Sequence, residues 1–476
     1  MMTLGELETK CRAAGQEHLL RFWNELDEAG RSMLSGQLEA LDFDKLGDLI
    51  KEYVLNRPAV AIASDLGPAP YFPLAPRSAE EAALYARAQV RGEELLRGGH
   101  VAALTVAGGQ GTRLGFDGPK GTYPIGPVSG KSLFQYFAES LLRAGEKYGK
   151  PITWYIMTST LNCEATKTFF ADNAYFGLAP EQLFFFIQGT MPAIGYDGKL
   201  LLGAKDSLSL SPDGHGGTLL ALRKSGALDR MRREDTTAIS YFQVDNPLVP
   251  VVNPFFIGMH DLTRSQMSSI MLAKTGPFEK LGNFCVSGGR LQIIEYSDLP
   301  AELAESRNPD GTLRFIAGSP AIHLIDRDFI AELTAGGSLN MPWHRADKKV
   351  PFVNAAGELV TPAEPNAVKL ESFIFDALPL AERTMVLEGA REAMFAPTKN
   401  ATGVDSVESC RAMLMERDAR WLEKARVRVA RHSDGTLAAA IEFSPLVAID
   451  EEDAKAYVAE CGMISVCAGA TLYLEP

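Results

Sequence analysis

Short apolar runs alternate with longer helix-like stretches from Val101 onward, and this alternation constrains the fold more than any other feature of the chain. The apolar runs occupy residues 101–106, 154–159, 183–188, 237–245 and 268–274. Helix-like stretches such as residues 132–149 lie between several of them. Strands that alternate with helices are typical of α/β domains. The pattern therefore predicts a doubly wound, Rossmann-like domain with a mixed, largely parallel sheet.

The segments on either side of this pattern differ from it. Residues 1–57 read as helical, because Leu19, Phe22, Trp23 and Leu26 recur at three- and four-residue steps. A linker with four prolines follows at 67–76, and another helix is expected near 78–97. A helix at 404–424 precedes short strand-like pieces, which predicts a small C-terminal α+β domain. We expect three parts: an N-terminal helical region at 1–97, a catalytic domain at 98–385 and a C-terminal domain at 386–476.

The charge balance narrows the class of ligand. The 476-residue chain has 47 Lys and Arg against 60 Asp and Glu, which gives a net charge of −13. A protein without a diffuse positive field is a poor binder of nucleic acid or of anionic membranes. Any phosphate that it handles must be held by a few local cations.

Cysteine usage and the N-terminal sequence bear on the compartment. Six cysteines are scattered without a CxxC pair, and no apolar run approaches the roughly 18 residues that a membrane span needs. The N-terminus MMTLGELETK has acidic residues where a secretory signal has a basic start and an apolar core. These features predict a cytoplasmic protein.

The strongest chemical signal is the glycine-rich segment AGGQGTRLGFDGPKG at 107–121, directly after the first apolar run. Gly108, Gly109 and Gly111 allow a sharp turn whose free N–H groups bind an anion or a base. Arg113 and Lys120 add two cations in the same loop. The alternative is an ordinary strand-to-helix turn.

Spacing argues against two better-known phosphate motifs. The dinucleotide fingerprint GxGxxG begins at Gly109 and Gly111, but Leu114 stands where the third glycine belongs. The P-loop pattern GxxxxGK[ST] ends correctly at residues 130–132, but its first position is Ile125. NAD(P)-linked oxidoreduction and P-loop hydrolysis are therefore disfavoured.

The loop resembles the signature GGQGTRLG…PKG of the UDP-sugar pyrophosphorylases, and the chain is most similar to the eukaryotic-type UDP-N-acetylglucosamine pyrophosphorylases. Further blocks follow in the order of that family, and the likeness covers nearly the whole chain. They are HLLRFWNEL (18–26), FFADNAYFGL (169–178), SPDGHGG (211–217), VDNPLV (244–249), EYSD (295–298), NAVKLESFIFD (366–376) and FAPTKNA (395–401).

The resemblance implies a nucleotidyltransferase that converts UTP and a sugar 1-phosphate into a UDP-sugar and pyrophosphate. In this reaction the sugar phosphate oxygen attacks the α-phosphorus, and it is already an anion, so no protein base is required. The obstacle is the meeting of two anionic substrates, which calls for positioning, cations and Mg²⁺. UTP, the sugar phosphate and their products are the expected partners, and we expect a monomer.

The resemblance also assigns roles to charged residues. Lys120, Lys369 and Lys399 match lysines that face phosphates, and Arg113 is expected to neutralise the triphosphate. Asp245 matches the ligand of the catalytic Mg²⁺. Its place at the end of a predicted strand suits ligand binding, and a carboxylate is a hard donor. The alternative for Asp245 is the capping of a turn before the following Asn-Pro pair.

Uridine binding is assigned to a second set of residues. Gln188 offers both a donor and an acceptor, which suits the N3–H and carbonyl edge of uracil. Gly189 follows it, and Gly214 permits close approach of backbone to the nucleotide. The backbone of the loop glycines at 108–111 also contributes to the base site. His215 is expected to hydrogen-bond the sugar phosphate or the ribose, or else to be a tolerated loop variant.

The preferred sugar is the point where the sequence departs from its relatives. Gly282, Glu295 and Ser319 align with sugar-contacting positions. The acetylglucosamine enzymes typically have AGN where this chain has Ala-Gly-Ser319, and PDGNGG where it has His215. N-acetylglucosamine 1-phosphate is the expected substrate, and glucose or galactose 1-phosphate stays open. A non-catalytic nucleotide-sugar binding protein on the same scaffold is the other alternative.

Overall fold

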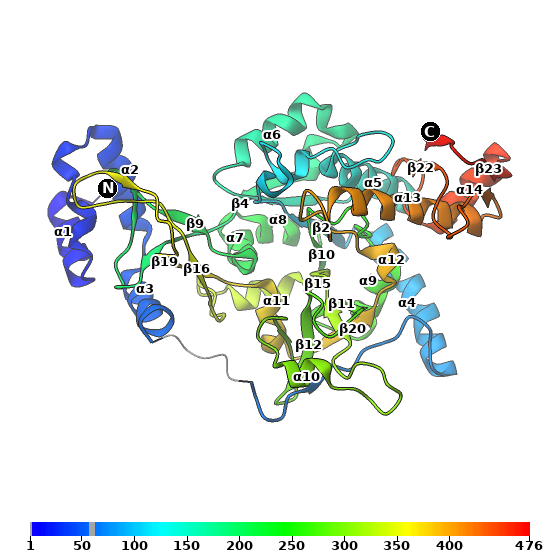
Figure 1. Ribbon diagram of the computed structural model, residues 1–476, viewed down its shortest axis with the longest axis horizontal. Helices are drawn as coiled ribbons and strands as arrows, with labels where there is room; N and C mark the ends of the chain where they lie inside the picture. Colours follow the sequence, from blue (N-terminus) through cyan, green and yellow to red (C-terminus); the bar gives the residue numbers. More distant parts are fainter. Residues whose placement is uncertain (1, 57–61) are drawn as a thin grey trace. The chain divides into compact units, whose positions relative to one another are not determined.

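The computed structural model describes residues 2–56 and 62–476, and the chain divides into two compact units (Figure 1). Unit 1 consists of Met1–Ile62, Gln188–Thr218 and Asn340–Asp376. Unit 2 consists of Ala63–Ile187, Leu219–Leu339 and Ala377–Pro476. Each unit is therefore built from three separate segments of the sequence.

Unit 1 joins the N-terminal helices to strands from two later segments. The helices are α1 (Leu4–Ala13), α2 (Glu28–Ala40) and α3 (Phe43–Leu49). The strands are β5 (Thr190–Pro192), β6 (Ile194–Gly195), β7 (Leu202–Ala204), β8 (Ser207–Leu208), β9 (Leu210–Pro212), β16 (His344–Lys348), β17 (Phe352–Val353), β18 (Leu359–Val360) and β19 (Ala367–Glu371). Strands β16, β19 and β6 form an antiparallel sheet. Leu7, Leu34 and Leu38 of the helices share one hydrophobic cluster with Val368 and Leu370 of β19.

The helical spacing at 19–26 produces two short 3₁₀ turns, at Glu17–Leu20 and Trp23–Glu25, in place of one helix. Leu19 and Phe22 are nevertheless buried. Both side chains enter the core because 3₁₀ turns also bring residues three apart to one face. Residues 57–61 of the predicted N-terminal region lie outside the described residues.

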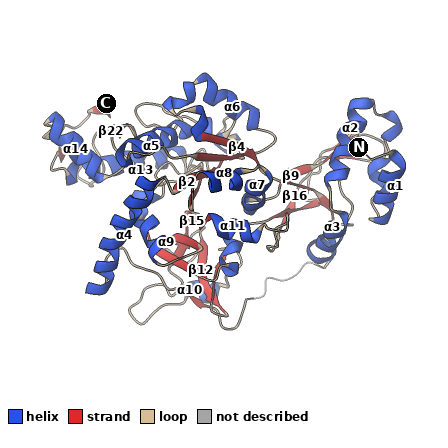
Figure 2. Cartoon of the chain, turned by 180° about the vertical axis from the view of Figure 1, so that it is seen from behind, coloured by secondary structure: helices blue, strands red, loops and turns tan. Residues whose placement is uncertain are grey.

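Unit 2 contains one large mixed sheet with helices on either side of it (Figure 2). Its strands are, in spatial order, β1 (Gly67–Pro68), β12 (Gly282–Ser287), β14 (Ala317–Ser319), β11 (Met267–Ala273), β15 (His323–Asp326), β10 (Ala238–Gln243), β2 (Val101–Val106), β3 (Trp154–Thr158) and β4 (Leu183–Ile187). Strands β13 (Arg290–Ile294) and β20 (Thr384–Glu388) pair with β12 and β11.

Strands β10, β2, β3 and β4 run parallel to one another. Every residue of β3 is buried, as expected for a strand covered by helices on both faces. The covering helices are α4 (Ala79–Gly98), α5 (Leu133–Tyr148), α6 (Cys163–Asp172), α7 (Thr218–Lys224), α8 (Ala227–Arg233), α9 (Pro254–Leu262), α10 (Ala301–Glu305), α11 (Arg327–Leu333) and α12 (Arg391–Met394). The predicted strands and helices are thus found within a few residues of their expected bounds.

The last part of unit 2, residues 407–476, is called the C-terminal module below. It contains α13 (Val407–Lys424), β21 (Arg428–Val429), β22 (Ala440–Phe443), α14 (Glu451–Cys461), β23 (Ser465–Val466) and β24 (Thr471–Leu474). Trp421, Ile441, Phe443 and Val458 belong to its own hydrophobic cluster. The division of the chain at residues 97 and 385 stays a prediction.

Candidate functional site

The glycine-rich loop begins directly after β2 and folds back on itself. Gly111 N donates to Gly118 O at 2.9 Å, and Lys120 N donates to Gly109 O at 3.0 Å. A Cβ on Gly111 would lie 2.7 Å from the ring of Phe116, so this turn excludes any larger residue. The loop therefore holds its backbone in one tight conformation.

A buried asparagine from the next strand-to-helix connection fixes the start of this loop. Asn162 donates from Nδ2 to the carbonyls of Ala107 at 2.9 Å and Gly109 at 3.3 Å. Its Oδ1 accepts from the N–H of Ser159 at 2.8 Å. Asn162 was not predicted, because a single asparagine after a strand carries no distinctive sequence signal.

Lys120 and Asp245 form the central ion pair of unit 2. Lys120 Nζ lies 3.1 Å from Asp245 Oδ2, and the two side chains are only 16% and 14% exposed. Asp245 follows β10 and the loop follows β2, and these strands are parallel neighbours. Their carboxyl ends therefore meet at one edge of the sheet, which is where α/β proteins bind ligands.

Lys399 is brought to the same edge by a backbone contact. Thr398 N donates to Asp245 O at 2.8 Å, so the residue before Lys399 is fixed to the metal-ligand candidate. Lys399 Nζ itself lies 3.8 Å from Asp405 Oδ2. Arg113 is exposed on the glycine-rich loop. Three predicted cations and one carboxylate thus belong to three neighbouring loops, which follow β2, β10 and α12.

Asn246 fixes the loop that contains Asp245 to the segment that leads to Lys399. Its Nδ2 donates to Met394 O at 2.7 Å, and its Oδ1 accepts from Ala396 N at 2.9 Å. The side chain is buried, so both of these bonds lie away from solvent. The sequence placed Asn246 only in a turn and gave it no role in the site.

The three predicted sugar-contacting residues are also grouped in unit 2. Gly282 of β12 is the direct cross-strand partner of Ser319 of β14. A Cβ on Gly282 would lie 3.6 Å from Glu295 Oε1 and 2.6 Å from a methyl group of Ile293. The backbone of Gly282 therefore lies close to the side chains of both Ile293 and Glu295.

Unit 1 contains the predicted uridine residues that lie outside the glycine-rich loop. Gln188 donates from Nε2 to Gly214 O at 2.7 Å, which engages one of its amide hydrogens. Its carbonyl oxygen is suited to accept the N3–H of uracil. Gly214 has a φ of +86°, and a Cβ there would lie 2.2 Å from Ser372 O. A Cβ on Gly189 would lie 2.2 Å from Asp213 Oδ2, so a side chain there would require the Asp213 side chain to move, whereas one at Gly214 would meet the backbone of Ser372.

His215 is half-buried in an aromatic cluster beside these residues. Its ring stacks on Phe373 with centroids 5.2 Å apart, and its Nδ1 accepts the N–H of Ile374 at 3.2 Å. Burial, with a smaller contribution from nearby His344, lowers the pKa of His215 to about 4. The ring is therefore neutral at pH 7, with its proton on Nε2 because Nδ1 accepts a hydrogen bond.

Lys369 lies on β19, opposite Ala346 of β16. Burial lowers the pKa of its ammonium from the ordinary value, and Glu371 opposes this shift. A half-buried cation whose charge is disfavoured by its surroundings is stabilised when an anion binds. The structure thus places Lys369 in unit 1 with Gln188, Gly189, Gly214 and His215, and the other predicted site residues in unit 2.

A metal at Asp245 is compatible with the donor set. Among the described residues, no group of three or more His, Cys, Asp or Glu side chains is arranged to hold a metal. Mg²⁺ is commonly held by one or two carboxylates together with substrate phosphates, so a single carboxylate fits that mode of binding. Asp245 is such a carboxylate, and it lies beside the loop that is expected to bind phosphate.

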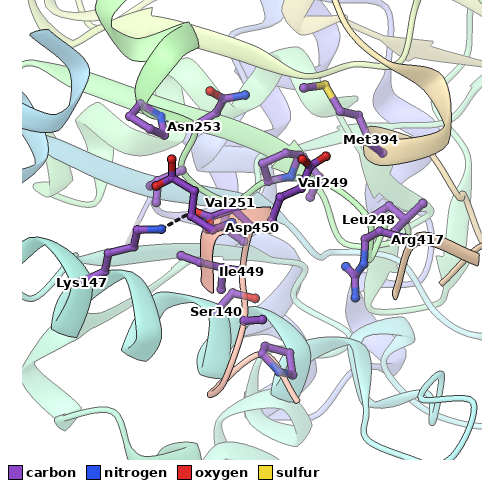
Figure 3. Close-up of a pocket in the computed structure, with 18 of the residues that line it drawn as sticks. Ser140, Lys147, Leu248, Val249, Val251, Asn253, Met394, Arg417, Ile449 and Asp450 are labelled. Atoms are coloured by element: carbon purple, nitrogen blue, oxygen red, sulfur yellow. Dashed lines mark hydrogen bonds and ion pairs between the residues drawn. The ribbon is translucent and has the colours of Figure 1, made fainter. Parts of the chain in front are cut away.

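A separate cavity of about 420 Å³ lies in unit 2, and none of the predicted site residues lines it (Figure 3). Leu248, Val249 and Val251 form part of its wall, and Lys147 and Asp450 face one another across an ion pair (Figure 3). The helices and loops around this cavity join α5 to the C-terminal module.

A family model described as UTP–glucose-1-phosphate uridylyltransferase matches residues 74–445. This chain belongs to that family. The matched region includes every predicted site residue, from the glycine-rich loop to Lys399.

Individual relatives agree with this assignment. The human UDP-N-acetylhexosamine pyrophosphorylase-like protein 1 is 35% identical over 95% of this chain and 94% of its own length. The UDP-N-acetylglucosamine pyrophosphorylase of Saccharomyces cerevisiae is 35% identical over 89% of this chain and 91% of its own length. The crystal structure of the Trypanosoma brucei uridine diphosphate N-acetylglucosamine pyrophosphorylase has a TM-score of 0.81 and covers 100% of this chain and 99% of its own, at 24% identity.

Membership of the family confirms three predictions from the sequence: the family itself, the α/β nucleotidyltransferase fold and the uridylyltransferase class of enzyme. The roles of individual site residues stay predictions. None of the helices in the described part of the chain combines the length and the hydropathy of a membrane-spanning segment.

Proposed function

We propose that the chain catalyses the reversible reaction of UTP with N-acetylglucosamine 1-phosphate, giving UDP-N-acetylglucosamine and pyrophosphate. A phosphate oxygen of the sugar phosphate attacks the α-phosphorus of UTP, the bond from that phosphorus to the β-phosphate oxygen breaks, and pyrophosphate leaves. The observation that carries the proposal is the ion pair of Lys120 and Asp245 beneath the glycine-rich loop.

The residues act through charge and position. The N–H groups of the glycine-rich loop and the side chain of Lys120 would bind UTP phosphates, because preformed donors stabilise negative charge without reorganising. Arg113 and Lys399 would lower the repulsion between the two anionic substrates. No side chain is required as a base, since the attacking oxygen is already charged.

Mg²⁺ is the proposed cofactor, with Asp245 as its protein ligand and substrate phosphates as the others. When bound, the ion would neutralise phosphate charge at the α-phosphorus. Lys120 is held against the same carboxylate, so it would keep Asp245 oriented toward the loop. Lys369 would supply a further phosphate contact.

Uridine would be held by Gln188, Gly189 and Gly214. Gln188 already donates to Gly214 O, and Gly189 O accepts from the N–H of Asp213. His215 would support this site through the backbone of Ile374. Gly282, Glu295 and Ser319 would contact the sugar. The names of the relatives support an N-acetylated sugar, whereas Ser319 and His215 keep glucose or galactose 1-phosphate as the alternative.

A panel of sugar 1-phosphates with UTP and Mg²⁺, followed by pyrophosphate release, tests the reaction and the sugar together. We expect N-acetylglucosamine 1-phosphate to have the highest kcat/KM. Preference for glucose or galactose 1-phosphate would replace the substrate and keep the reaction. Binding of UDP-sugars without pyrophosphate release from any sugar phosphate would instead indicate a non-catalytic binding protein.

We further propose that the enzyme is a cytosolic monomer. All six cysteines are free thiols, which matches the usage of proteins in reducing compartments. Light scattering of the purified chain and fractionation of its native cells test these two points.

A further inference from the structure

The C-terminal module contacts the segment that follows the glycine-rich loop (residues 122–132, called the arm below) through one buried carboxylate. Glu442 of β22 accepts from the N–H groups of Val128 and Ser129, both at 2.7 Å. It also accepts from Ser129 Oγ at 2.6 Å and from the hydroxyl of Tyr136. Four donors from residues 128–136 therefore converge on a single side chain that has no exposed surface.

This arrangement holds the arm in one position. A buried carboxylate is stable only while its hydrogen bonds are made, and bonds to a charged acceptor are stronger than bonds between neutral groups. A shift of the arm would break bonds from two consecutive N–H groups at once. The arm also passes close to the carboxylate, because a Cβ on Gly126 would lie 3.0 Å from Glu442 Oε1.

The lysine of the incomplete P-loop pattern strengthens the same anchor. Lys131 Nζ lies 2.6 Å from Glu139 of α5 and donates to Ser444 Oγ at 3.2 Å. The next residue, Ser132, accepts from Gln135 N at 3.1 Å and so caps α5. The sequence at 130–132 therefore fixes the loop to α5 and to the C-terminal module.

A continuous set of bonds leads from this anchor back to Lys120. Tyr123 N donates to Lys120 O at 3.1 Å, and Leu133 N donates to Tyr123 O at 3.1 Å. Arg411 of α13 donates to the carbonyls of Ile125 at 3.2 Å and Pro124 at 2.8 Å. Hydrogen bonds within this segment and from Arg411 therefore hold the backbone between Lys120 and the start of α5.

We propose that Glu442 is a positioning residue for Lys120, through which the C-terminal module forms part of the catalytic machinery. The proposal rests on the function proposed above, because it assumes that Lys120 binds phosphate in the transition state. Release of the arm would leave UTP binding largely intact. It would allow Lys120 to move away from the phosphate charge that develops in the transition state. The expected signature is a fall in kcat with little change in KM.

A matched control exists in the same module. Asp453 of α14 is also buried and also fastens the module to α5, by ion pairs of 3.1 Å with Arg143 and with Lys147. In the described part of the chain, its side chain accepts from Arg143, Lys147 and the N–H of Ile449, and none of these residues belongs to the glycine-rich loop or the arm. Glu442→Gln and Asp453→Asn each neutralise one buried carboxylate between the module and α5, but only the first change affects the loop.

The experiment measures kcat and KM for UTP and the hydrogen–deuterium exchange of peptides within 107–131 in both variants. For Glu442→Gln we expect kcat to fall at least tenfold, KM to change less than threefold and loop amides to exchange at least tenfold faster. For Asp453→Asn we expect kcat and loop exchange within twofold of the wild type. Equal effects of the two variants on kcat and on exchange would overturn the proposal.

The exchange readout separates this proposal from the proposed function. If the wild type releases no pyrophosphate with any sugar phosphate, the proposed function fails, and equal loop exchange in the two variants still refutes the anchor. Should Glu442→Gln not fold, Ser129→Ala removes one of the four donors and keeps the carboxylate. It is expected to speed loop exchange about threefold, and unchanged exchange would count against the anchor.

Discussion

The ion pair of Lys120 with Asp245 allows stability and catalysis to be separated in one set of variants. Two unit charges 3.1 Å apart attract each other by about 5 kcal/mol at an effective dielectric of about 20. Most of this attraction is offset by the hydration that both side chains lose, since they are only 16% and 14% exposed. We therefore expect Lys120→Met and Asp245→Asn each to cost about 2 kcal/mol of unfolding free energy.

The double variant is expected to be more stable than the sum of the two single changes predicts. Each single change leaves one charge without its partner, and the second change removes that charge, so a coupling of about 1–2 kcal/mol should appear. Catalysis should show no such recovery, because the two groups have separate roles. Each single variant and the double variant should lose at least 100-fold in kcat, which corresponds to about 2.7 kcal/mol.

Urea unfolding gives the stabilities, and pyrophosphate release with UTP and N-acetylglucosamine 1-phosphate gives the rates. Lys150→Ala, a change at an exposed lysine of the same unit, serves as the control and should alter either quantity only slightly. Additive losses of stability would refute the interpretation of the pair. Near-normal turnover in either single variant would refute the role of that residue.

Three further predictions concern the other parts of the site. The pKa of His215 is about 4 in the folded protein and 6.5 without perturbation, so only the unfolded state takes up its proton between these two pH values. The free energy of unfolding should therefore fall by up to roughly 3 kcal/mol as the pH drops from 6.5 to 4. In urea unfolding, His215→Asn should show a weaker dependence of stability on pH than the wild type. Gly214 has a φ of +86° and a Cβ there would clash with Ser372, so Gly214→Ala should lower the free energy of unfolding by more than 2 kcal/mol and raise the KM for UTP. Gly226 has a φ of +79° in open space, so Gly226→Ala, the control, should lower it by only about 1 kcal/mol. Thermal unfolding measures both stabilities. Asn162→Ala should raise the KM for UTP at least fivefold, because the carbonyls at 107 and 109 lose their donor; an unchanged KM in steady-state assays would show that the loop does not depend on it.

The sequence was sufficient for the elements of the central sheet and for the family. The apolar runs at 101–106 and 154–159 became β2 and β3 almost residue for residue, because the alternation of strand and helix is a local pattern. The glycine-rich loop was recognisable for the same reason, since its residue types and spacing lie within one short segment. The spacing at 19–26 predicted helical structure, but it could not distinguish an α-helix from consecutive 3₁₀ turns.

The grouping of the site could be predicted only in part. The ion pair of Lys120 with Asp245 joins residues 125 positions apart, and each was expected only because its local motif matched a family pattern. Asn162 and Glu442 have no such motif, and Asn246 lies in the block VDNPLV but received no role from it. Each is an ordinary polar residue at the end of or within a short element, and nothing nearby in the sequence shows that it will be buried.

Only the tertiary structure showed that the N-terminal helices share a core with strands from 188–218 and 340–376, and that Glu442 fastens the loop around Lys120. Periodicity and motif spacing depend only on a residue's neighbours along the chain, and they were enough to predict most helices and strands of this protein. The pairing of distant segments depends on the apolar surface and the hydrogen bonds that the whole packing satisfies. For that reason the sequence by itself determined the strands, the loop and the class of enzyme, whereas packing decided which distant residues hold that loop in place.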